Sequence, residues 1–253
     1  MYLIHMRPEQ VQDAVRRRVA VVIPAGCVEY HGPHLPIGTD FLIANAVCEA
    51  AAKQVECVVA PPLSFAPTMA WAAGPEEGEA DFEPEAFFVY SREVLRRIAA
   101  MGFRRIYLLQ HHQGPDGLEV LCLKRAAGEV LRETVHGWGA GWGRGPTEDL
   151  PIPDIFGWIR VAYIDTFSQY PGPKPGPIPI GHAGRGETQL IMGALPDTVR
   201  MGALDTLDRL PQWLEDAAEA DADDGRRWLE FCVQGWVKEL GRGILPASQG
   251  TAG

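Results

Sequence analysis

Short runs of apolar and β-branched residues alternate along this chain with longer segments that repeat an apolar residue every three or four positions. The short runs predict buried strands, at residues 19–24, 55–61, 105–109 and 160–164. The longer segments predict helices, at residues 44–52, 84–101 and 118–134. Because strands that alternate with helices of this length form βαβ units, we expect an α/β fold with a mostly parallel sheet covered on both faces.

The end of the chain predicts one more helix. Residues 217–240 begin with an acidic turn and continue as an amphipathic segment with Trp228, Phe231, Cys232 and Trp236 on one side. This apolar stripe predicts packing against the core or against another subunit.

Two stretches differ from the rest in composition. Residues 137–147 are rich in glycine and tryptophan, and residues 171–179 alternate proline with glycine. Both predict loops. Neither lies between two halves that could each form a core, so we expect a single domain over residues 1–253.

Composition and charge limit the class of protein. The chain has 253 residues, 46% of them hydrophobic, which is enough to fill a sizeable core. Its formal net charge of −10 repels phosphate backbones and anionic headgroups, so we expect neither nucleic acid nor a membrane surface as a partner. The sequence contains no apolar run of about 20 residues and begins without the layout of a signal peptide, which predicts a cytoplasmic protein.

The five cysteines are scattered, odd in number and never spaced as a CxxC pair. This pattern favours neither a disulfide framework nor a thiolate zinc site, and it predicts reduced, mostly buried thiols. Cys27 stands two positions before Glu29. It could serve as a nucleophile or as a small apolar residue at a strand end.

Histidines gather in three short segments that each follow a predicted strand. Five of the seven histidines belong to them: His31, His34, His111, His112 and His182. In open α/β sheets, ligands bind beyond the carboxyl ends of the strands, where loops from different strands meet. The three segments therefore predict one functional site.

The first segment, residues 23–40, supplies Glu29, His31, His34 and Asp40. Alternate residues of an extended stretch point the same way, so Glu29 and His31 can face one ion. Asp40 returns after a loop, and its two oxygens could bridge two ions; taken alone, Asp40 is better explained as a cap of the following helix, whereas the whole cluster favours a metal site. Nitrogen and oxygen donors together suit Zn²⁺, Mn²⁺ or Fe²⁺ better than Ca²⁺ or Mg²⁺.

The second segment places His111 and His112 at the end of the strand predicted at residues 105–109. Adjacent side chains diverge in an extended chain, so we expect at most one of the two to reach the ion. The third segment is a glycine loop entering a helix, with Glu187 in the first turn as either a ligand or a helix-dipole partner. The ordinary pKa of a histidine suits His182 for proton transfer near neutrality.

Together the segments resemble the creatininase (creatinine amidohydrolase) family. Residues 26–40 are similar to the family pattern of Gly, two residues, Glu, any residue, His-Gly, then a His and a later Asp. The family also has a His-Ala-Gly, three-residue, Glu-Thr stretch. Residues 182–188 are similar to it: they read His-Ala-Gly and then, after two residues, Glu187-Thr188. The tail GRRWLEFCVQGWVKEL, residues 225–240, resembles the family's ending around Cys-Val-Gln-Gly.

The resemblance implies a three-layer α/β/α sandwich that assembles as a homo-oligomer, commonly a hexamer. It implies two divalent ions bridged by the aspartate and a set of metal ligands: Glu29, His31, Asp40, His112 and the further candidate Glu187. His182 corresponds to the family's catalytic histidine, which gives a proton to the departing nitrogen.

The chain departs from the family in two places. Many members carry Asn-Gly-His-Gly-Gly-Asn where residues 110–115 read QHHQGP, and creatininase itself has Tyr-Glu where this chain has Gln113 and Gly114. One metal site thereby loses a carboxylate, which argues against creatinine as the substrate. Residues 76–85, EEGEADFEPE, replace a Gly-Thr loop of the family and indicate a different pocket.

We therefore expect a metal-dependent amidohydrolase that acts on a non-peptide C–N bond of a small amide or cyclic amide through metal-activated water. His182 or Glu187 would transfer the proton. Three alternatives stay open: a formamide hydrolase or peptidase of the same family, a metal-binding assembly subunit or sensor without turnover, and a structural α/β protein. The sequence does not identify which of Zn, Mn or Fe binds.

Overall fold

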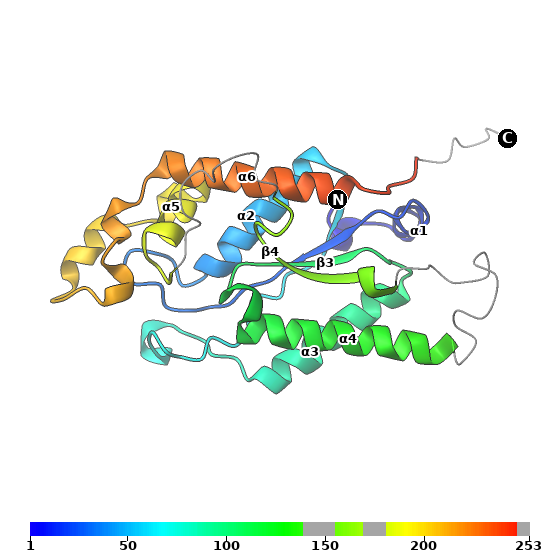
Figure 1. Ribbon diagram of the computed structural model, residues 1–253, viewed down its shortest axis with the longest axis horizontal. Coiled ribbons are helices and arrows are strands. Elements are labelled where there is room, and N and C mark those ends of the chain that lie inside the picture. Colours follow the sequence, from blue (N-terminus) through cyan, green and yellow to red (C-terminus); the bar gives the residue numbers. More distant parts are fainter. Residues whose placement is uncertain (139–154, 169–180, 247–253) are drawn as a thin grey trace.

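The computed structural model describes residues 1–138, 155–168 and 181–246 (Figure 1). Within these ranges one parallel sheet has the strand order β2-β1-β3-β4. Its strands are β1 (Val21–Pro24), β2 (Val58–Val59), β3 (Ile106–Gln110) and β4 (Ile159–Tyr163). The predicted parallel sheet is confirmed.

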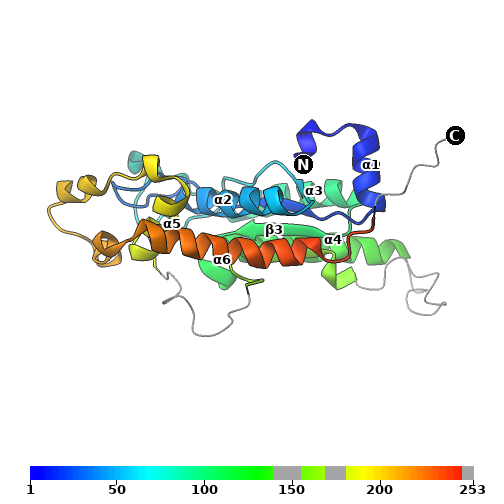
Figure 2. The same cartoon turned by 90° about the horizontal axis from the view of Figure 1, so that it is seen from above.

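Helices cover both faces of the sheet (Figures 1 and 2). One face carries α3 (Pro84–Ala100) and α4 (Leu118–Trp138). The other carries α2 (Thr39–Gln54), α5 (Arg185–Ala194) and α6 (Ala222–Gly241). The three-layer α/β/α sandwich is therefore confirmed, and none of the helices described is long and apolar enough to cross a membrane.

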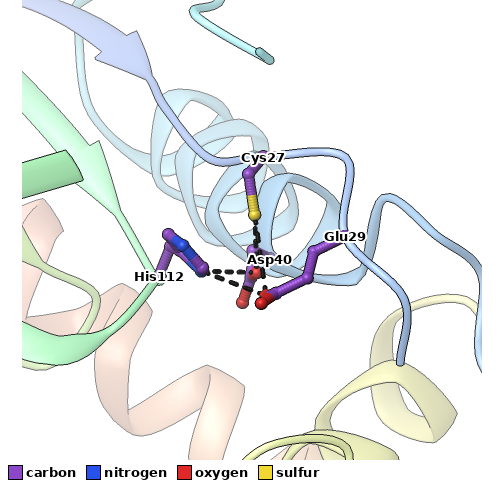
Figure 3. A group of neighbouring side chains, drawn as sticks. All are labelled: Cys27, Glu29, Asp40 and His112. Carbon is purple, nitrogen blue, oxygen red and sulfur yellow. Dashed lines mark hydrogen bonds and ion pairs between the residues drawn. The ribbon is translucent and has the colours of Figure 1, made fainter. Parts of the chain in front are cut away.

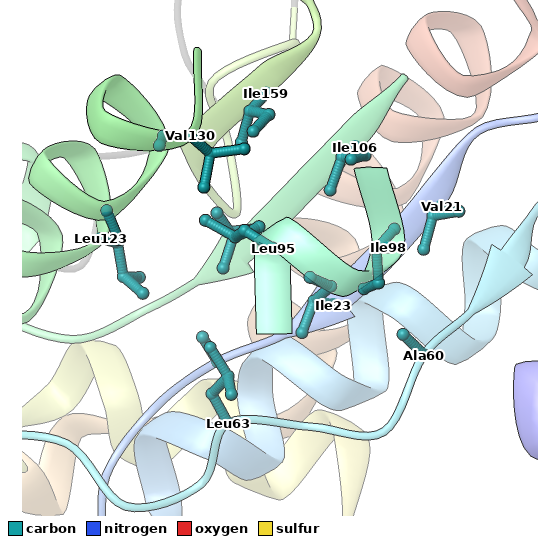
Figure 4. Close-up of a cluster of buried hydrophobic side chains, with 14 of the residues drawn as sticks. Val21, Ile23, Ala60, Leu63, Leu95, Ile98, Ile106, Leu123, Val130 and Ile159 are labelled. Atoms are coloured by element: carbon teal, nitrogen blue, oxygen red, sulfur yellow. The ribbon is translucent and has the colours of Figure 1, made fainter. Parts of the chain in front are cut away.

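The strands bury both faces because their side chains alternate between two apolar cores. Val21 and Ile23 point into the core shared with α3 and α4, which Figure 4 shows around Leu95 and Leu123. Val22 points into the opposite core, beneath α2 and α6. Such double burial is typical of parallel strands and explains their continuous apolar runs.

Two elements differ from prediction. Strand β2 is shorter than the predicted residues 55–61, because prolines, which have no amide hydrogen to donate, follow at 61 and 62. Helix α1 (Pro8–Arg16) was not predicted. It begins with proline in its first turn, and the side-chain oxygen of Gln10 accepts the amide of Arg7 at 2.8 Å.

Short 3₁₀ turns connect α5 to α6: Pro196–Thr198, Met201–Thr206, Gln212–Leu214 and Ala217–Glu219. They bring Trp213 beside the ring of His182, with centroids 4.9 Å apart. The predicted loop at residues 171–179, and that at residues 137–147 except its first two positions, lie outside the described residues.

Candidate metal centre

The predicted ligands meet beyond the carboxyl ends of β1 and β3. Glu29 and His31 follow β1, and His112 follows β3. Asp40 stands in the first turn of α2, and Glu187 in the first turn of α5. All five side chains are buried. The sheet topology therefore gathers residues from three distant segments, as the strand-end rule predicts.

The loop after β1 is folded back onto the start of α2. The amide of Glu29 donates to the carbonyl of Ile37 at 2.8 Å. Gly26 packs so closely on α2 that an added Cβ would lie 2.6 Å from the Cα of Phe41. This close approach places Glu29 near Asp40 although eleven positions separate them.

A first cluster of possible ligands consists of Cys27, Glu29, Asp40 and His112, and Asp40 lies at its centre (Figure 3). Its Oδ2 is 2.9 Å from Nδ1 of His112 and 3.0 Å from Sγ of Cys27. Oε2 of Glu29 lies 3.3 Å from the same His112 nitrogen. Cys27, Glu29, Asp40 and His112 can each offer one ligand atom within 4.8 Å of the others.

Asp40 also belongs to a second cluster, with His31 and Glu187. Nε2 of His31 is 3.5 Å from Oδ2 of Asp40 and 3.4 Å from Oε2 of Glu187. The Nδ1–H of His31 donates to the carbonyl of Glu29 at 3.0 Å, which leaves Nε2 as the lone-pair nitrogen. Asp40 therefore belongs to both clusters.

The buried carboxylates and histidines of the site strongly shift one another's pKa values. Burial alone would raise the pKa of Asp40, but His31 and His112 lower it well below its ordinary value. Burial would lower the pKa of His112, whereas Asp40 raises it to about 9. Burial and Asp40 raise the pKa of Glu29 to about 8. Without a metal, protons on the histidines balance the buried carboxylates.

The donor set fits a divalent first-row metal. Oε1 of Glu29 and Nε2 of His31 are buried without a hydrogen-bond partner among the residues described, so both are available to an ion. Imidazole nitrogens mixed with carboxylate oxygens suit Zn²⁺, Mn²⁺ or Fe²⁺. An ion bound here would displace the protons that the histidines carry.

His111 lies apart from its neighbour. Its Nε2 is 3.5 Å from Oε1 of Glu187, and its ring stacks on Tyr163 with centroids 5.0 Å apart. His112, by contrast, contacts Glu29 and Asp40. The two side chains diverge as expected for adjacent residues, and the structure places His112 at the shared aspartate.

His182 faces the site with a defined tautomer. Its Nε2 lies 2.6 Å from the carbonyl of Tyr30, an acceptor only, so Nε2 carries the hydrogen. Nδ1, with the lone pair, is 3.7 Å from Oε2 of Glu29. Burial and the neighbouring His31 lower the pKa of His182 to about 4, so the ordinary value used in the sequence argument is wrong for this environment.

Glu187 is held as an anion. Its Oε2 accepts the amide of Ala183 at 2.6 Å. Burial alone would raise its pKa, but His31 and the nearby ring of His111 lower the pKa to about 2. An ionised carboxylate suits a metal ligand and cannot donate a proton.

The remaining residues of the first segment have structural contacts. All five cysteines are buried and unpaired. Burial and the adjacent Asp40 raise the pKa of Cys27 well above its ordinary value, which argues against a thiolate nucleophile. Nε2 of His34 lies 2.9 Å from the hydroxyl of Thr188, which donates to the carbonyl of Ala183. His34 therefore ties the first segment to the third.

A cavity of about 590 Å³ opens onto the clusters, and residues outside the predicted set line it: Trp71, Gln113, Tyr163 and Asp165 among them. Tyr163 and Asp165 stand at the carboxyl end of β4, so the same strand-end argument would have found them. Trp71 packs against His182 with centroids 4.8 Å apart, and its local sequence carries no comparable signal.

Glu119 is a further buried acid that the sequence analysis did not single out. It is fully buried, and neither carboxylate oxygen has a hydrogen-bond partner within the described ranges. Burial raises its pKa to about 8, with His112 opposing and Asp40 reinforcing the change. The sequence does hold a signal, because Glu119 shares the helical stripe of Leu123, Ala126 and Val130.

Comparison with known proteins identifies a family and several relatives of this chain. Residues 5–240 match the profile of a family described as Creatininase: Creatinine amidohydrolase. The creatinine amidohydrolase of Pseudomonas putida is 25% identical over 242 residues, covering 85% of this chain and 86% of that protein. The mycofactocin precursor peptide peptidase of Mycobacterium tuberculosis (strain H37Rv) is 34% identical over 131 residues, covering 49% of each.

A third relative is matched over a shorter stretch. The 3-dehydro-scyllo-inosose hydrolase of Thermotoga maritima is 29% identical over 112 residues, which cover 44% of this chain and 36% of that protein. This chain thus matches about a third of the inosose hydrolase and half of the peptidase, but most of the P. putida enzyme.

Solved structures share the fold. A crystal structure of creatinine amidohydrolase (creatininase) aligns with a TM-score of 0.75 and 21% identity, covering 97% of this chain and 98% of its own. The manganese form of creatininase aligns with a TM-score of 0.74 and 21% identity, covering 97% of this chain and 99% of its own. These alignments extend the agreement from local motifs to nearly the whole architecture.

Proposed function

Because this chain belongs to the creatininase family, whose members are hydrolases, we propose that it is a metal-dependent amidohydrolase acting on a C–N bond of a small amide or cyclic amide. One observation carries the proposal: two buried clusters of nitrogen and oxygen donors share Asp40 at the carboxyl end of the sheet. A cavity of about 590 Å³ above them offers room for a small substrate.

Two divalent ions, of zinc, manganese or iron, fit the clusters. Glu29, Asp40 and His112 would hold one ion. His31, Asp40 and Glu187 would hold the other. The buried, unpartnered donor atoms of Glu29 and His31 support this assignment. Among the structural neighbours, a manganese form and a zinc-zinc form of creatininase exist.

The proposed chemistry divides between the metal and the chain. A bound divalent metal supplies Lewis acidity and lowers the pKa of water. His182 is neutral at pH 7, with its Nε2–H held by the carbonyl of Tyr30 and the Nδ1 lone pair facing the site. It would accept the proton of the attacking water and, because its pKa is low, release that proton readily to the departing nitrogen. Glu187, ionised, is assigned to the metal and not to proton donation.

Peptide hydrolysis is the second candidate function. The stretch matched by the M. tuberculosis peptidase has a higher identity, 34%, than the match to the P. putida enzyme, 25%. A peptide would use the same ligands and would differ in how the cavity walls accept its flanking residues. A formamide substrate is smaller and would occupy only part of the cavity.

Metal analysis with a substrate panel tests these proposals. We expect purified protein to contain zinc, manganese or iron and to hydrolyse at least one of an amide, lactam, formamide or short-peptide set. Chelator should remove this activity, and added metal should restore it. Bound metal without any hydrolysis would favour a non-catalytic subunit or sensor, and absence of bound metal would reject the proposed centre.

Replacing His31 gives the sharpest variant. His31→Ala removes a donor of the second cluster, so activity should be abolished and bound metal reduced, as elemental analysis would measure. His136→Ala is the matched control, because His136 is exposed on α4. A His31→Ala protein with full metal content and full rate would contradict the assignment.

A further inference from the structure

A second cavity, at the opposite end of the sheet from the metal centre, is lined by arginines. It has a volume of about 530 Å³, and its lining residues come from the starts of β3 and β4, from the end of α1 and from the end of α6. Six arginines line it: Arg16, Arg18, Arg104, Arg105, Arg160 and Arg242. We call it the arginine cavity.

This concentration of positive charge opposes the charge of the whole chain. The formal net charge is −10, with 23 lysines and arginines against 33 acids. Among the residues that line the arginine cavity, Glu239 is the only acid. The lining of the cavity is therefore mostly positive, although the net charge of the chain is negative.

The internal partners of the arginines hold them in place without balancing their charge. Glu239 is shared by Arg160 and Arg242, each with an N–O distance of 3.0 Å. Arg105 donates to the carbonyls of Glu239 and Leu240, which carry no net charge.

The other three arginines add charge with little compensation. Arg104 donates to backbone carbonyls, and its guanidinium lies 4.3 Å from the ring centroid of Trp158. Arg16 pairs with Asp13 at 3.1 Å. The exposed side chain of Arg18 has no acidic partner in the described part of the chain. Two carboxylates thus face six guanidinium groups.

Such an arrangement favours an anion with several oxygens. Guanidinium groups donate paired N–H groups to phosphate or carboxylate oxygens, and contacts with backbone carbonyls pre-orient Arg104 and Arg105. Phe103 and the aliphatic carbons of Val15 also line the cavity and offer apolar surface. The walls therefore combine fixed positive charge with room for a compact apolar body.

We propose that the arginine cavity binds a small, multiply charged organic anion whose phosphate or carboxylate groups contact the guanidinium groups. This site is separate from the metal centre, since β3 runs from one to the other and its five residues span about 16 Å. The inference does not depend on the reaction at the metal centre.

Calorimetric titration of the full chain at low ionic strength tests the proposal with three probes. Inorganic phosphate and AMP supply phosphate oxygens, and tricarballylate supplies carboxylates. We expect saturable binding of at least one probe that weakens as salt is added. Arg18→Gln and Arg160→Gln should each weaken it about tenfold or more, because each removes a charge-assisted contact. Arg209→Gln, which changes an exposed arginine outside the cavity, should bind as the unaltered protein does.

The metal centre is the competing anion site, and one variant separates the two. His31→Ala should keep the affinity for the probe while losing metal. Circular dichroism and urea unfolding establish that each variant is folded. The proposal is overturned if no probe binds, if folded Arg18→Gln and Arg160→Gln variants bind normally, or if His31→Ala abolishes binding.

Discussion

The carboxyl groups of the metal centre differ in charge because their immediate surroundings differ. Asp40 and Glu187 contact histidines that keep them ionised. Burial is the main influence on the pKa of Glu29 and of Glu119, and it raises each to about 8. Glu119 has no hydrogen-bond partner for either oxygen among the residues described. Its charge state therefore makes the stability of the metal-free protein depend on pH.

Glu119→Gln should reduce that dependence. Between pH 4.5 and 8 the folded protein retains a proton on Glu119 that the unfolded chain has lost, so the free energy of unfolding falls as pH rises through this window. Glutamine cannot ionise. Urea unfolding of chelator-treated protein should show a decline from pH 5.5 to 8.5 that is smaller in the variant by roughly a few kcal/mol.

Glu29 shares the direction of this effect, so some pH dependence should remain in Glu119→Gln. Cys57 is buried in the other apolar core, the one beneath α2 and α6. Cys57→Ser therefore serves as a control for substitution of a buried residue. An unchanged pH dependence in Glu119→Gln would show that Glu119 is ionised in the folded protein.

Replacing each of the two adjacent histidines should affect metal binding to a different extent. His112→Ala removes a donor in contact with Glu29 and Asp40, so we expect the metal of the first cluster to be lost. His111→Ala removes only a neighbour of Glu187 and should weaken metal binding about 10 to 100-fold. Elemental analysis and competition with a chromophoric chelator measure both effects. Greater metal loss in His111→Ala would reverse the assignment.

At the scale of elements, the position of Glu187 in the site depends on how closely α5 packs against α6. Helix α5 carries Glu187 and Thr188, and α6 packs along it. Gly225 in the first turn of α6 lies against the backbone of Gln189, whose carbonyl oxygen an added Cβ would overlap. The missing side chain lets the helices approach, so the position of Glu187 depends on a residue on another element.

Gly225→Ala should therefore disturb both stability and the site. Forcing the helices apart should lower the free energy of unfolding by about 1–3 kcal/mol and reduce hydrolysis by displacing Glu187. Gly128→Ala is the matched control, because a Cβ on that α4 residue meets nothing within 4 Å. It should be neutral or stabilising by up to about 1 kcal/mol. Equal unfolding midpoints for the two variants would contradict this account of the crossing.

At the scale of the whole molecule, the metal centre joins parts of the chain that are far apart in sequence. Its proposed ligands come from the loop after β1, the end of β3 and the starts of α2 and α5. Bound ions would thus connect the sheet to the helical layer that contains α2 and α5. A single domain over residues 1–253, assembly as a homo-oligomer and a cytoplasmic location stay predictions.

Chelation should lower the stability of the entire protein. A ligand that binds only the folded state stabilises it by about 2.7 kcal/mol at a free concentration one hundred times its Kd. We expect chelator to lower the thermal unfolding midpoint and added zinc or manganese to restore it. His31→Ala should respond weakly to both treatments. An unchanged midpoint in the unaltered protein would show that no metal is linked to folding.

The sequence alone predicted the elements whose signals are local. Apolar runs and helical periodicity located the four strands and the long helices that the structure describes, because burial on one or both faces fixes the spacing of apolar residues. The prolines at 61 and 62, which follow β2, were also a local signal, and the predicted strand at residues 55–61 ran into them. Helix α1 had only its terminal signals, a proline and the Gln10 contact, and was missed.

The candidate ligands were also visible in the sequence, since Glu29, His31 and Asp40 belong to one short motif after a strand. Only the tertiary structure decided that His112 faces Asp40, that burial lowers the pKa of His182, and that Glu187 is ionised. It also gathered arginines from four separate segments into one cavity. Electrostatic energies and metal coordination depend on distances through space, and only the folded chain fixes those distances.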